Sequence, residues 1–338
     1  MNNRITIIVD YLGFLRREKY QSSSLNITNI KNYFIKAGYD CKVYTYQEIA
    51  NNNCNICNSF ILYTSSEFLS YKNYIGDNLL MLNKSNTLIP NYDFFQSHNN
   101  KGFQELLKRK YKIKSLWYHY FGTFEEIKNE IKQINFPVVL KHLDGSGGEN
   151  IMLIKSKKAL FKQVKKQSKG KRHLINQFKK ILKRYIFKKT YTYNNSLESL
   201  YYKNFILQEY VPNLKNDWKI LIFFDKYYIL KREIKFNDFR ASGSGKFSYE
   251  NKVNSKLLDY CQKIIKSFNI PWISLDVCYY QKKFHLLEFQ TMHFGPLTIM
   301  NSSHYYINKN NNWIKIKEKS DLSNEFARSF IKHLKENF

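Results

Sequence analysis

Two acidic residues lie at matching positions in the two arms of a predicted β-hairpin, SLDVCYYQKKFHLLEF, at residues 274–289. A three-residue turn at Gln281–Lys283 would place Asp276 directly opposite Glu288, whereas a two-residue turn would place them on opposite faces. With the longer turn, the apolar residues share the other face of the hairpin. Opposed carboxylates repel each other unless a cation lies between them, and Mg²⁺ prefers hard oxygen ligands beside phosphates. The spacing therefore predicts a magnesium site, with solvated strand residues as the alternative.

A glycine-rich loop follows a short apolar run in FPVVLKHLDGSGGENIMLIKS, residues 136–156. Glycines let backbone N–H groups approach phosphate oxygens without a clash at Cβ. Lys141 ends the first apolar run, where an anionic partner would explain a charged side chain. We therefore predict a strand–loop–strand hairpin that contacts phosphates, with an ordinary glycine turn as the alternative. The loop residues are Gly145, Ser146, Gly147 and Gly148.

A second loop, KREIKFNDFRASGSGKF at residues 231–247, is rich in cations and small residues. Such a loop can close over a triphosphate and place positive charge against the charge that develops during phosphoryl transfer. Lys231 is a candidate for binding the nucleotide, and Arg232 and Arg240 are candidates for catalysis. A solvated basic loop is the alternative.

The elements that would position these residues form an α/β (α+β) chain, in which we predict three regions. Residues 1–95 alternate short apolar runs with a helical pattern, which is typical of a parallel, Rossmann-like sheet. Residues 96–205 carry the glycine-rich hairpin between helices. Residues 206–338 carry two further hairpins, the first of which turns around Asp225–Lys226.

The order of these motifs resembles the ATP-grasp superfamily, most closely its RimK-like and D-alanine–D-alanine ligase-like carboxylate–amine ligases. The resemblance covers residues 95–300. FPVVLKHLDGSGGENI looks like the family's ATP-clamping flap, and ILQEYVPN is similar to the hinge whose backbone reads adenine. KNDWKILIFFDKYYILKRE, NDFRASGSGK and SLDV…LLEFQ resemble the D-x-R strand pair, the DFRSN-type loop and the D…E-x-N metal signature.

Each match implies a role for residues of this chain. Lys101 and Lys141 would contact the ATP phosphates, and Asp217 would lie near the ribose, with Lys219 in place of the usual arginine. Arg240 would lie near the γ-phosphate. The residues implied to read adenine are Gln208, Glu209, Tyr210 and Val211. The implied Mg²⁺ ligands, for two ions, are Asp276, Glu288 and Gln290, the last of which replaces the family's usual asparagine.

The resemblance implies the ATP-grasp fold, in which two α+β lobes clamp ATP, preceded here by a Rossmann-like N-terminal domain. It also implies a ligase, in which ATP phosphorylates a substrate carboxylate and an amine attacks the acyl phosphate. The alternatives are an ATP-grasp phosphotransferase that acts on a small molecule, and a non-catalytic ATP-binding, membrane-associated protein. The intact Lys141, Asp276 and Glu288 argue against the non-catalytic protein, but analogy of fold does not separate ligase from phosphotransferase.

The chain is strongly basic, with 55 Lys and Arg against 27 Asp and Glu and a net charge of +28. Residues 155–189 contain over half of this excess and no acid, and a predicted insertion at 167–190 shows helical apolar spacing over 171–189. Three interpretations of this basic helix remain open. It packs on its own domain with its charges in solvent, it contacts an anionic membrane, or it binds an acidic glycan or peptide. We favour an acidic carboxylate substrate, such as a uronic acid in polysaccharide biosynthesis. Nucleic acid is not expected, because no nucleic-acid-binding fold is recognisable.

The N-terminus lacks the features of a signal peptide, and the apolar runs are shorter than the about 20 residues that span a bilayer. Five scattered cysteines argue against a disulfide framework, and the single CxxC, at Cys54 and Cys57, lacks the further ligands that zinc needs. We expect a cytoplasmic protein, with peripheral contact at the inner face of the membrane if the basic helix binds lipid. The sequence leaves the oligomeric state open. His293 either packs in the core or faces the acceptor substrate.

Overall fold

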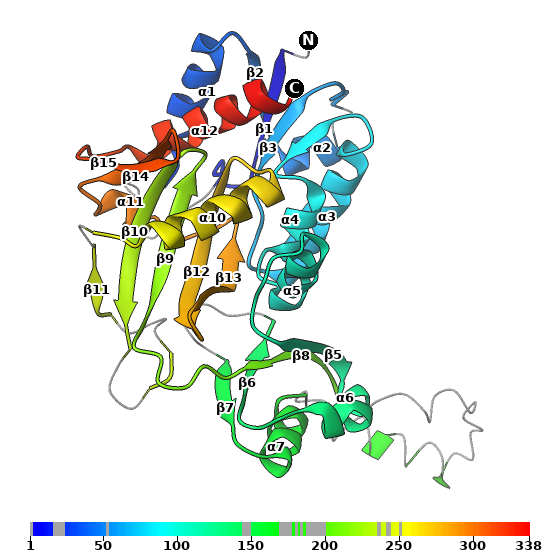
Figure 1. The fold of residues 1–338 in the computed structure, drawn as a ribbon. Coiled ribbons are helices and arrows are strands. Elements are labelled where there is room, and N and C mark those ends of the chain that lie inside the picture. Colours follow the sequence, from blue (N-terminus) through cyan, green and yellow to red (C-terminus); the bar gives the residue numbers. More distant parts are fainter. Residues whose placement is uncertain are drawn as a thin grey trace. The chain divides into compact units, whose positions relative to one another are not determined.

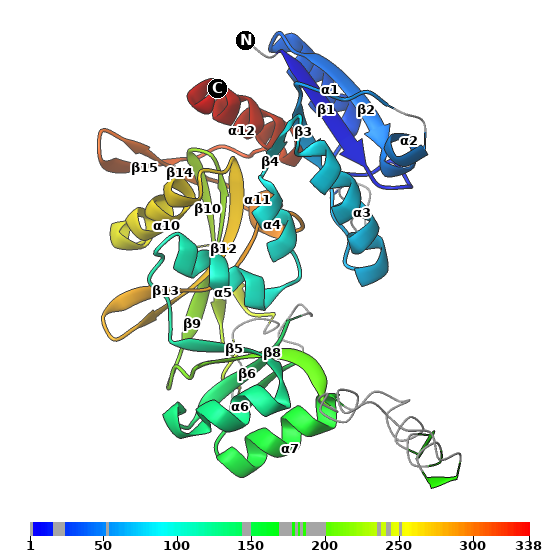
Figure 2. The same ribbon diagram turned by 90° about the vertical axis from the view of Figure 1, so that its right-hand side faces the viewer.

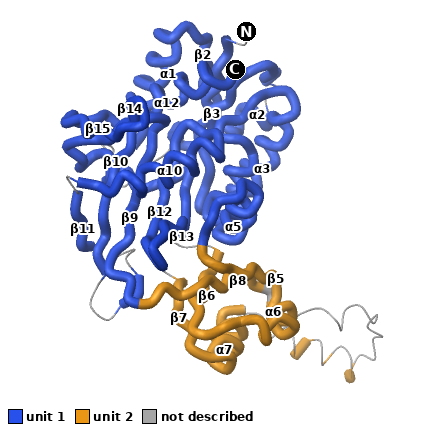
Figure 3. Tube along the Cα trace, in the orientation of Figure 1, with its two compact units in different colours: residues 1–115, 213–338 blue, residues 116–212 orange. Residues whose placement is uncertain are grey.

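The computed structural model (Figure 1 and Figure 2) describes residues 3–15, 24–51, 54–143, 150–168, 178–179, 182, 185–186, 201–234, 238–240, 245–249 and 252–338. The chain divides into two compact units (Figure 3). Unit 1 comprises residues 1–115 and 213–338, and unit 2 comprises residues 116–212. The predicted division into 1–95, 96–205 and 206–338 stays a prediction.

The N-terminal part of unit 1 is a four-stranded parallel sheet with the order β2-β1-β3-β4. β1 pairs in parallel with both β2 and β3, which confirms the parallel sheet that the alternating pattern predicted. From β1 the chain first adds β2 on one side and then β3 on the other, so the strand order reverses between β1 and β3. Ligands of open α/β sheets bind at the carboxyl ends of the strands at such a point. The elements are β1 (Arg4–Val9), α1 (Ile27–Lys36), β2 (Asp40–Thr45), α2 (Tyr46–Asn51), β3 (Phe60–Tyr63), α3 (Leu69–Leu82), β4 (Thr87–Ile89) and α4 (Tyr92–Ser97).

The second sheet of unit 1 is antiparallel and has seven strands, in the order β13-β12-β9-β10-β14-β15 with β11 paired to β10. Its two hairpins, β9–β10 and β12–β13, are the predicted ones. The strands are β9 (Asn216–Phe223), β10 (Lys226–Glu233), β11 (Phe247–Ser248), β12 (Trp272–Tyr280), β13 (Lys283–Gln290), β14 (Tyr305–Lys309) and β15 (Asn312–Ile316). The helices of this part are α5 (Lys101–Lys110), α10 (Ser255–Phe268), α11 (Leu297–Met300) and α12 (Leu322–Asn337).

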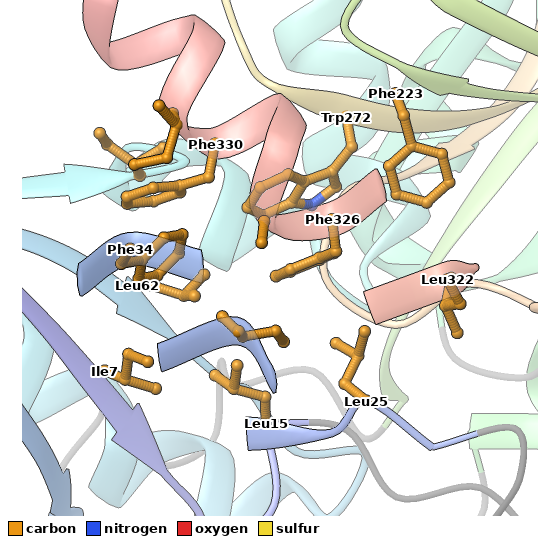
Figure 4. Packing of buried hydrophobic residues seen from close by; sticks show 14 of the residues in the cluster. Ile7, Leu15, Leu25, Phe34, Leu62, Phe223, Trp272, Leu322, Phe326 and Phe330 are labelled. Carbon is orange, nitrogen blue, oxygen red and sulfur yellow. The ribbon is translucent and has the colours of Figure 1, made fainter. Parts of the chain in front are cut away.

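The two faces of this sheet pack into different cores because successive side chains of a strand point to opposite sides. Ile220 and Ile222 of β9 join the core that α10 covers. Phe223 and Trp272 join a core shared with α1, α12 and the parallel sheet, where Trp272 stacks on Phe326 with ring centroids 3.9 Å apart (Figure 4). The second face is therefore apolar at this end, and the charged residues described below lie further along the same strands.

Unit 2 is a four-stranded antiparallel sheet with the order β5-β8-β6-β7 and its own apolar core. A capping box, in which Thr123 and Glu126 bond each other's backbone N–H groups, starts α6. The elements are β5 (Tyr118–Thr123), α6 (Phe124–Glu130), the 3₁₀ helix η2 (Ile131–Gln133), β6 (Val138–His142), β7 (Ile151–Ile154), α7 (Lys157–Ser168) and β8 (Tyr202–Glu209).

The predicted basic helix at 171–189 lies largely outside the described residues. Of its apolar residues that the structure describes, Phe178, Tyr185 and Ile186 are 64%, 71% and 64% exposed, and Leu182 is partly buried. Within the part of the chain that the structure describes, none of the helices combines the length and the apolar character needed to cross a bilayer. Contact of the basic segment with a membrane stays a prediction.

Candidate active site

Charged residues of unit 1 lie on one face of the large antiparallel sheet. This is the face to which the side chain of Trp272 also belongs. Asp217 of β9 pairs directly with Arg232 of β10, and both side chains are almost fully buried. Arg232 donates two hydrogen bonds to Asp217, from Nε to Oδ1 and from Nη2 to Oδ2, each 2.7 Å long. Its Nη2 also lies 3.0 Å from Oδ2 of Asp276 on β12. One guanidinium therefore joins two carboxylates, and bidentate charged pairs of this kind are the strong ones.

Polar contacts continue from Asp276 to the edge of the sheet. Nζ of Lys219 lies 3.6 Å from Oδ1 of Asp276 and 3.5 Å from Oε1 of Gln290. Gln290 donates from Nε2 to Oε1 of Glu288 over 3.4 Å, and Nζ of Lys101, at the start of α5, lies 3.9 Å from the same oxygen. The structure thus brings seven residues named from the sequence into one chain of contacts: Lys101, Asp217, Lys219, Arg232, Asp276, Glu288 and Gln290.

Asp276 faces Glu288 across β12 and β13, as the sequence predicted, but the predicted turn is wrong. Tyr280 pairs with Lys283, so the turn contains only Gln281 and Lys282. Both turn residues have a left-handed backbone, with φ of 48° and 61°. This conformation follows the right-handed twist of the strands, which favours two-residue hairpin turns.

A β-bulge compensates for the shorter turn. With the two-residue turn alone, Asp276 would pair with Leu287 and Glu288 would point to the other face. Instead, Val277 pairs with Leu286 and Asp276 pairs with Glu288, so Leu287 is an extra residue on β13. The bulge therefore turns Glu288 and Gln290 to the face that carries Asp276.

Burial and neighbouring charges act in opposite directions on the two aspartates. Burial raises the pKa of Asp217 to about 6, although the guanidinium of Arg232 works to lower it. Burial also opposes the ionisation of Asp276, but the charges of Arg232 and Lys219 outweigh it and lower the pKa of Asp276. Asp276 is therefore ionised near neutral pH, as a metal ligand must be.

Asp276 has an oxygen that a cation can use. Its Oδ1 is buried and has the ammonium of Lys219 3.6 Å away, but it accepts no hydrogen bond from the described residues. A buried oxygen in this state can take a further ligand. No group of three or more His, Cys, Asp or Glu in the described ranges could hold a metal by itself. Mg²⁺, however, takes one or two carboxylates and completes its shell with water and phosphate oxygens. The donors of Asp276, Glu288 and Gln290 fit this ion.

Two residues predicted for the site are not brought to this cluster. Lys231 precedes Arg232 on β10, so its side chain points to the opposite face of the sheet. Arg240 pairs locally with Asp238, to which it donates from Nη2 and Nε over 2.9 and 3.0 Å. Their contacts with a nucleotide stay predictions.

The other predicted nucleotide-binding residues belong to unit 2. Lys141 on β6 is 9% exposed, and Gln208 on β8 is 2% exposed. The ladder of β8 ends at Glu209, whose backbone N donates to Trp117 O over 2.9 Å, and Tyr210–Val211 follow the strand. Residues in the predicted phosphate loop lie outside the described residues: Gly145, Ser146, Gly147 and Gly148.

A second polar group, which we call the His98–His293 cluster, comprises Thr64, Ser65, Lys72, His98 and His293. Nδ1 of His98 lies 2.7 Å from Oγ of Ser65, and Nε2 of His293 lies 3.2 Å from Oγ1 of Thr64. The two imidazole rings meet edge to face, with centroids 4.7 Å apart. Lys72 donates to the carbonyl oxygen of His98, and burial lowers the pKa of Lys72 to about 8.

His293 is the member of this cluster that the sequence analysis singled out, because it follows Gln290 by three residues. Thr64 and Ser65 directly follow β3, so the cluster lies at the carboxyl end of a strand where ligands bind in open α/β sheets. The arrangement presents a half-buried ammonium and two imidazoles, which can bind an anion.

No family model matches the chain, and no curated protein matches it. Solved structures do. N5-carboxyaminoimidazole synthetase from Staphylococcus aureus, complexed with ADP, is similar with a TM-score of 0.54 and 13% identity over 90% of this chain and 74% of that one. D-cycloserine synthetase DcsG is similar with a TM-score of 0.53 and 9% identity over 98% and 99% of the two chains.

D-alanine–D-alanine ligase from Bacillus anthracis is similar as well, with a TM-score of 0.51 and 12% identity over 99% of each chain. Identities this low indicate a shared fold and nothing finer. The chain has the ATP-grasp fold, as the order of its motifs predicted.

Proposed function

We propose that the chain is an ATP-dependent carboxylate–amine ligase that forms an amide through an acyl phosphate. The observation that carries the proposal is the chain of contacts that begins at Asp217 and Arg232 and continues through Asp276 to the edge of the sheet, where Lys219 and Gln290 connect it to Glu288. It combines a carboxylate pair suited to Mg²⁺ with three cations, on a sheet of the ATP-grasp fold. Phosphoryl transfer depends on positioning and on cations that neutralise charge, so no covalent nucleophile is needed.

In this proposal Asp276, Glu288 and Gln290 hold Mg²⁺, which supplies charge neutralisation at the transferring phosphoryl group. Lys101 and Lys219 lie within 4 Å of the two carboxylates and balance their charge. A cation at the carboxylate oxygens would compete with the two ammonium groups for these oxygens and would favour contacts of the ammonium groups with phosphate oxygens. Binding of metal and of nucleotide is therefore coupled.

For Arg232 we propose a positioning role in place of the catalytic one predicted from the sequence. Its guanidinium is held by Asp217 and Asp276 together and is 7% exposed. We propose that Arg232 fixes the carboxylate of Asp276, so that Oδ1 faces the metal. Contacts of Lys141 and of Arg240 with ATP phosphates, and of the segment Gln208–Val211 with adenine, remain separate parts of this proposal.

We place the acidic substrate at the His98–His293 cluster. The ammonium of Lys72 contacts a carbonyl oxygen and lies over the ring of Phe95, so its charge is not balanced by either contact. His293 follows Gln290 by three residues, a distance along the chain that keeps a bound carboxylate near the metal ligands. A uronate of a glycan precursor or an acidic peptide would supply this carboxylate, in keeping with the net charge of +28.

Product analysis tests the reaction. The protein is incubated with ATP, Mg²⁺ and pooled carboxylates and amines, and the products are identified by mass spectrometry. ADP together with a condensed amide supports the ligase. ADP with a stable phosphorylated product would instead make the chain a phosphotransferase, and no turnover of nucleotide with any pool would make it a binding protein.

A further inference from the structure

The bulge at Leu287 needs support from outside its own hairpin. An extra residue in a strand leaves backbone groups that the neighbouring strand does not pair. β13 is also an edge strand of its sheet, so its outer side has no ladder to complete it. The position of Glu288 therefore depends on what binds the backbone around Leu287.

Lys108 of α5 binds this backbone. It is 1% exposed, and its Nζ donates to the carbonyl oxygens of Leu286 and Leu287 over 3.0 and 3.1 Å. Its third partner is Oε1 of Glu105, at 2.9 Å, one turn back on the same helix. An ammonium has three donor hydrogens, and these three acceptors can use all of them.

Helix α5 runs beside β13 (Figure 2), and other residues on its face toward the strand extend the contact. Oε1 of Gln104 accepts from the backbone N of Phe289 over 3.4 Å, and Lys101 approaches Glu288. Positions 101, 104 and 108 recur at helical spacing and so face the strand together. The helix thus contacts the backbone on both sides of Glu288.

We propose that Lys108 is a positioning residue of the metal site, which acts by holding the bulge that brings Glu288 opposite Asp276. The inference rests on the magnesium site in the proposed function. Without the ammonium, the buried carbonyls of Leu286 and Leu287 lose their partner, and the regular ladder becomes the competing arrangement. In that ladder Leu287 faces Asp276, and Glu288 points away.

The test compares metal affinity in paired substitutions. Lys108→Met removes the ammonium and keeps the apolar stem, and Glu105→Gln in the same protein avoids a buried, uncompensated carboxylate. Mn²⁺ affinity is measured with a non-hydrolysable ATP analogue bound, so the readout does not depend on turnover. We expect a loss of about 10- to 100-fold, the size of effect that partners of metal ligands have.

A matched control separates this effect from a general loss of stability. Lys226 at the start of β10 and Glu325 on α12 form another largely buried ion pair, with Nζ and Oε1 2.6 Å apart. Lys226→Met with Glu325→Gln should lower the melting temperature and leave Mn²⁺ affinity unchanged. An equal loss of metal affinity in the control, or none in the Lys108 variant, would overturn the proposal.

Deletion of Leu287 provides a second test of the positioning role. The Lys108→Met, Glu105→Gln double variant is compared with its parent in this deletion background. Without this residue the two-residue turn pairs Asp276 with Glu288 in a regular ladder, so no bulge has to be held. Mn²⁺ affinity should then be unaffected by Lys108→Met with Glu105→Gln. A loss that persists in the deletion background would contradict the positioning role, whereas wild-type protein that bound neither Mn²⁺ nor nucleotide would overturn the proposed function itself.

Discussion

Arg232 on β10 contacts Asp276 on β12 across the intervening strand β9, with 3.0 Å between Nη2 and Oδ2. The same guanidinium also binds Asp217 on β9. The guanidinium thus contacts both carboxylates. Its removal would leave two buried carboxylates without their shared partner, and the loss of one partner from a buried charge pair is strongly destabilising.

Arg232→Met should therefore lower the free energy of unfolding by about 3–5 kcal/mol, measured by urea denaturation. Arg240→Met is the control, because Arg240 forms a more exposed pair with Asp238 and should change stability by less than about 1 kcal/mol. Equal effects of the two substitutions would show that Arg232 is not the centre of the buried network.

Asp276→Asn should weaken binding of Mn²⁺ in the nucleotide complex by more than about 100-fold, because loss of a ligand exceeds the effect of losing a ligand's partner. Calorimetric titration with and without nucleotide measures it. Asp225→Asn is the control, since Asp225 is held by Arg328 and Lys332 at 2.7 Å each, away from Glu288 and Gln290. Undiminished affinity in Asp276→Asn would remove the metal site from this position.

The pairing of Asp276 with Glu288 was predicted from the sequence for an incorrect reason. The predicted turn was one residue too long, and the bulge adds the residue that the turn lacks. The sequence of the hairpin does not reveal the bulge, because Lys108, which binds it, lies 178 residues from Leu286. Local patterns predict strands and faces, but a register that depends on a distant helix is set by tertiary packing.

The contact of Asp217 with Arg232 shows the same limit. The predicted turn at Asp225–Lys226 would have placed Asp217 opposite Ile234. The structure turns one residue earlier, at Phe224–Asp225, and Phe224 adopts a φ of 59° that is rare for large side chains. The proposed metal ligands and phosphate lysines could be named from the order of motifs, whereas the residues of the His98–His293 cluster meet only in the folded chain.

Lys72 should make substrate binding depend on pH. Burial lowers the pKa of Lys72 to about 8, so its ammonium is charged below this pH and neutral above it. Affinity for an anionic substrate should therefore fall as the pH rises through about 8. In Lys72→Met the KM for the acid should rise by about 10-fold or more, the scale of one charge-assisted hydrogen bond, and lose this pH dependence.

The KM for ATP should not change in Lys72→Met, since the metal and phosphate residues lie elsewhere. Lys84→Met, on the exposed turn after α3, is the control and should keep the pH profile of the wild type. An unchanged KM for the acid in Lys72→Met would move the substrate away from the His98–His293 cluster.

His333 should make stability depend on pH in a more acidic range. It is 5% exposed on α12, its Nδ1 lies 3.2 Å from the side-chain amide N of Asn337, and burial lowers its pKa from 6.5 to about 4. Between these two values the unfolded chain binds a proton that the folded chain does not, so stability falls as the pH decreases from 6.5 to about 4 and is fully present above 6.5. The shift contributes about 3 kcal/mol to the free energy of unfolding above pH 6.5. His333→Gln should flatten this part of the curve of unfolding free energy against pH, and a slope identical to that of the wild type would assign the acid sensitivity to other groups.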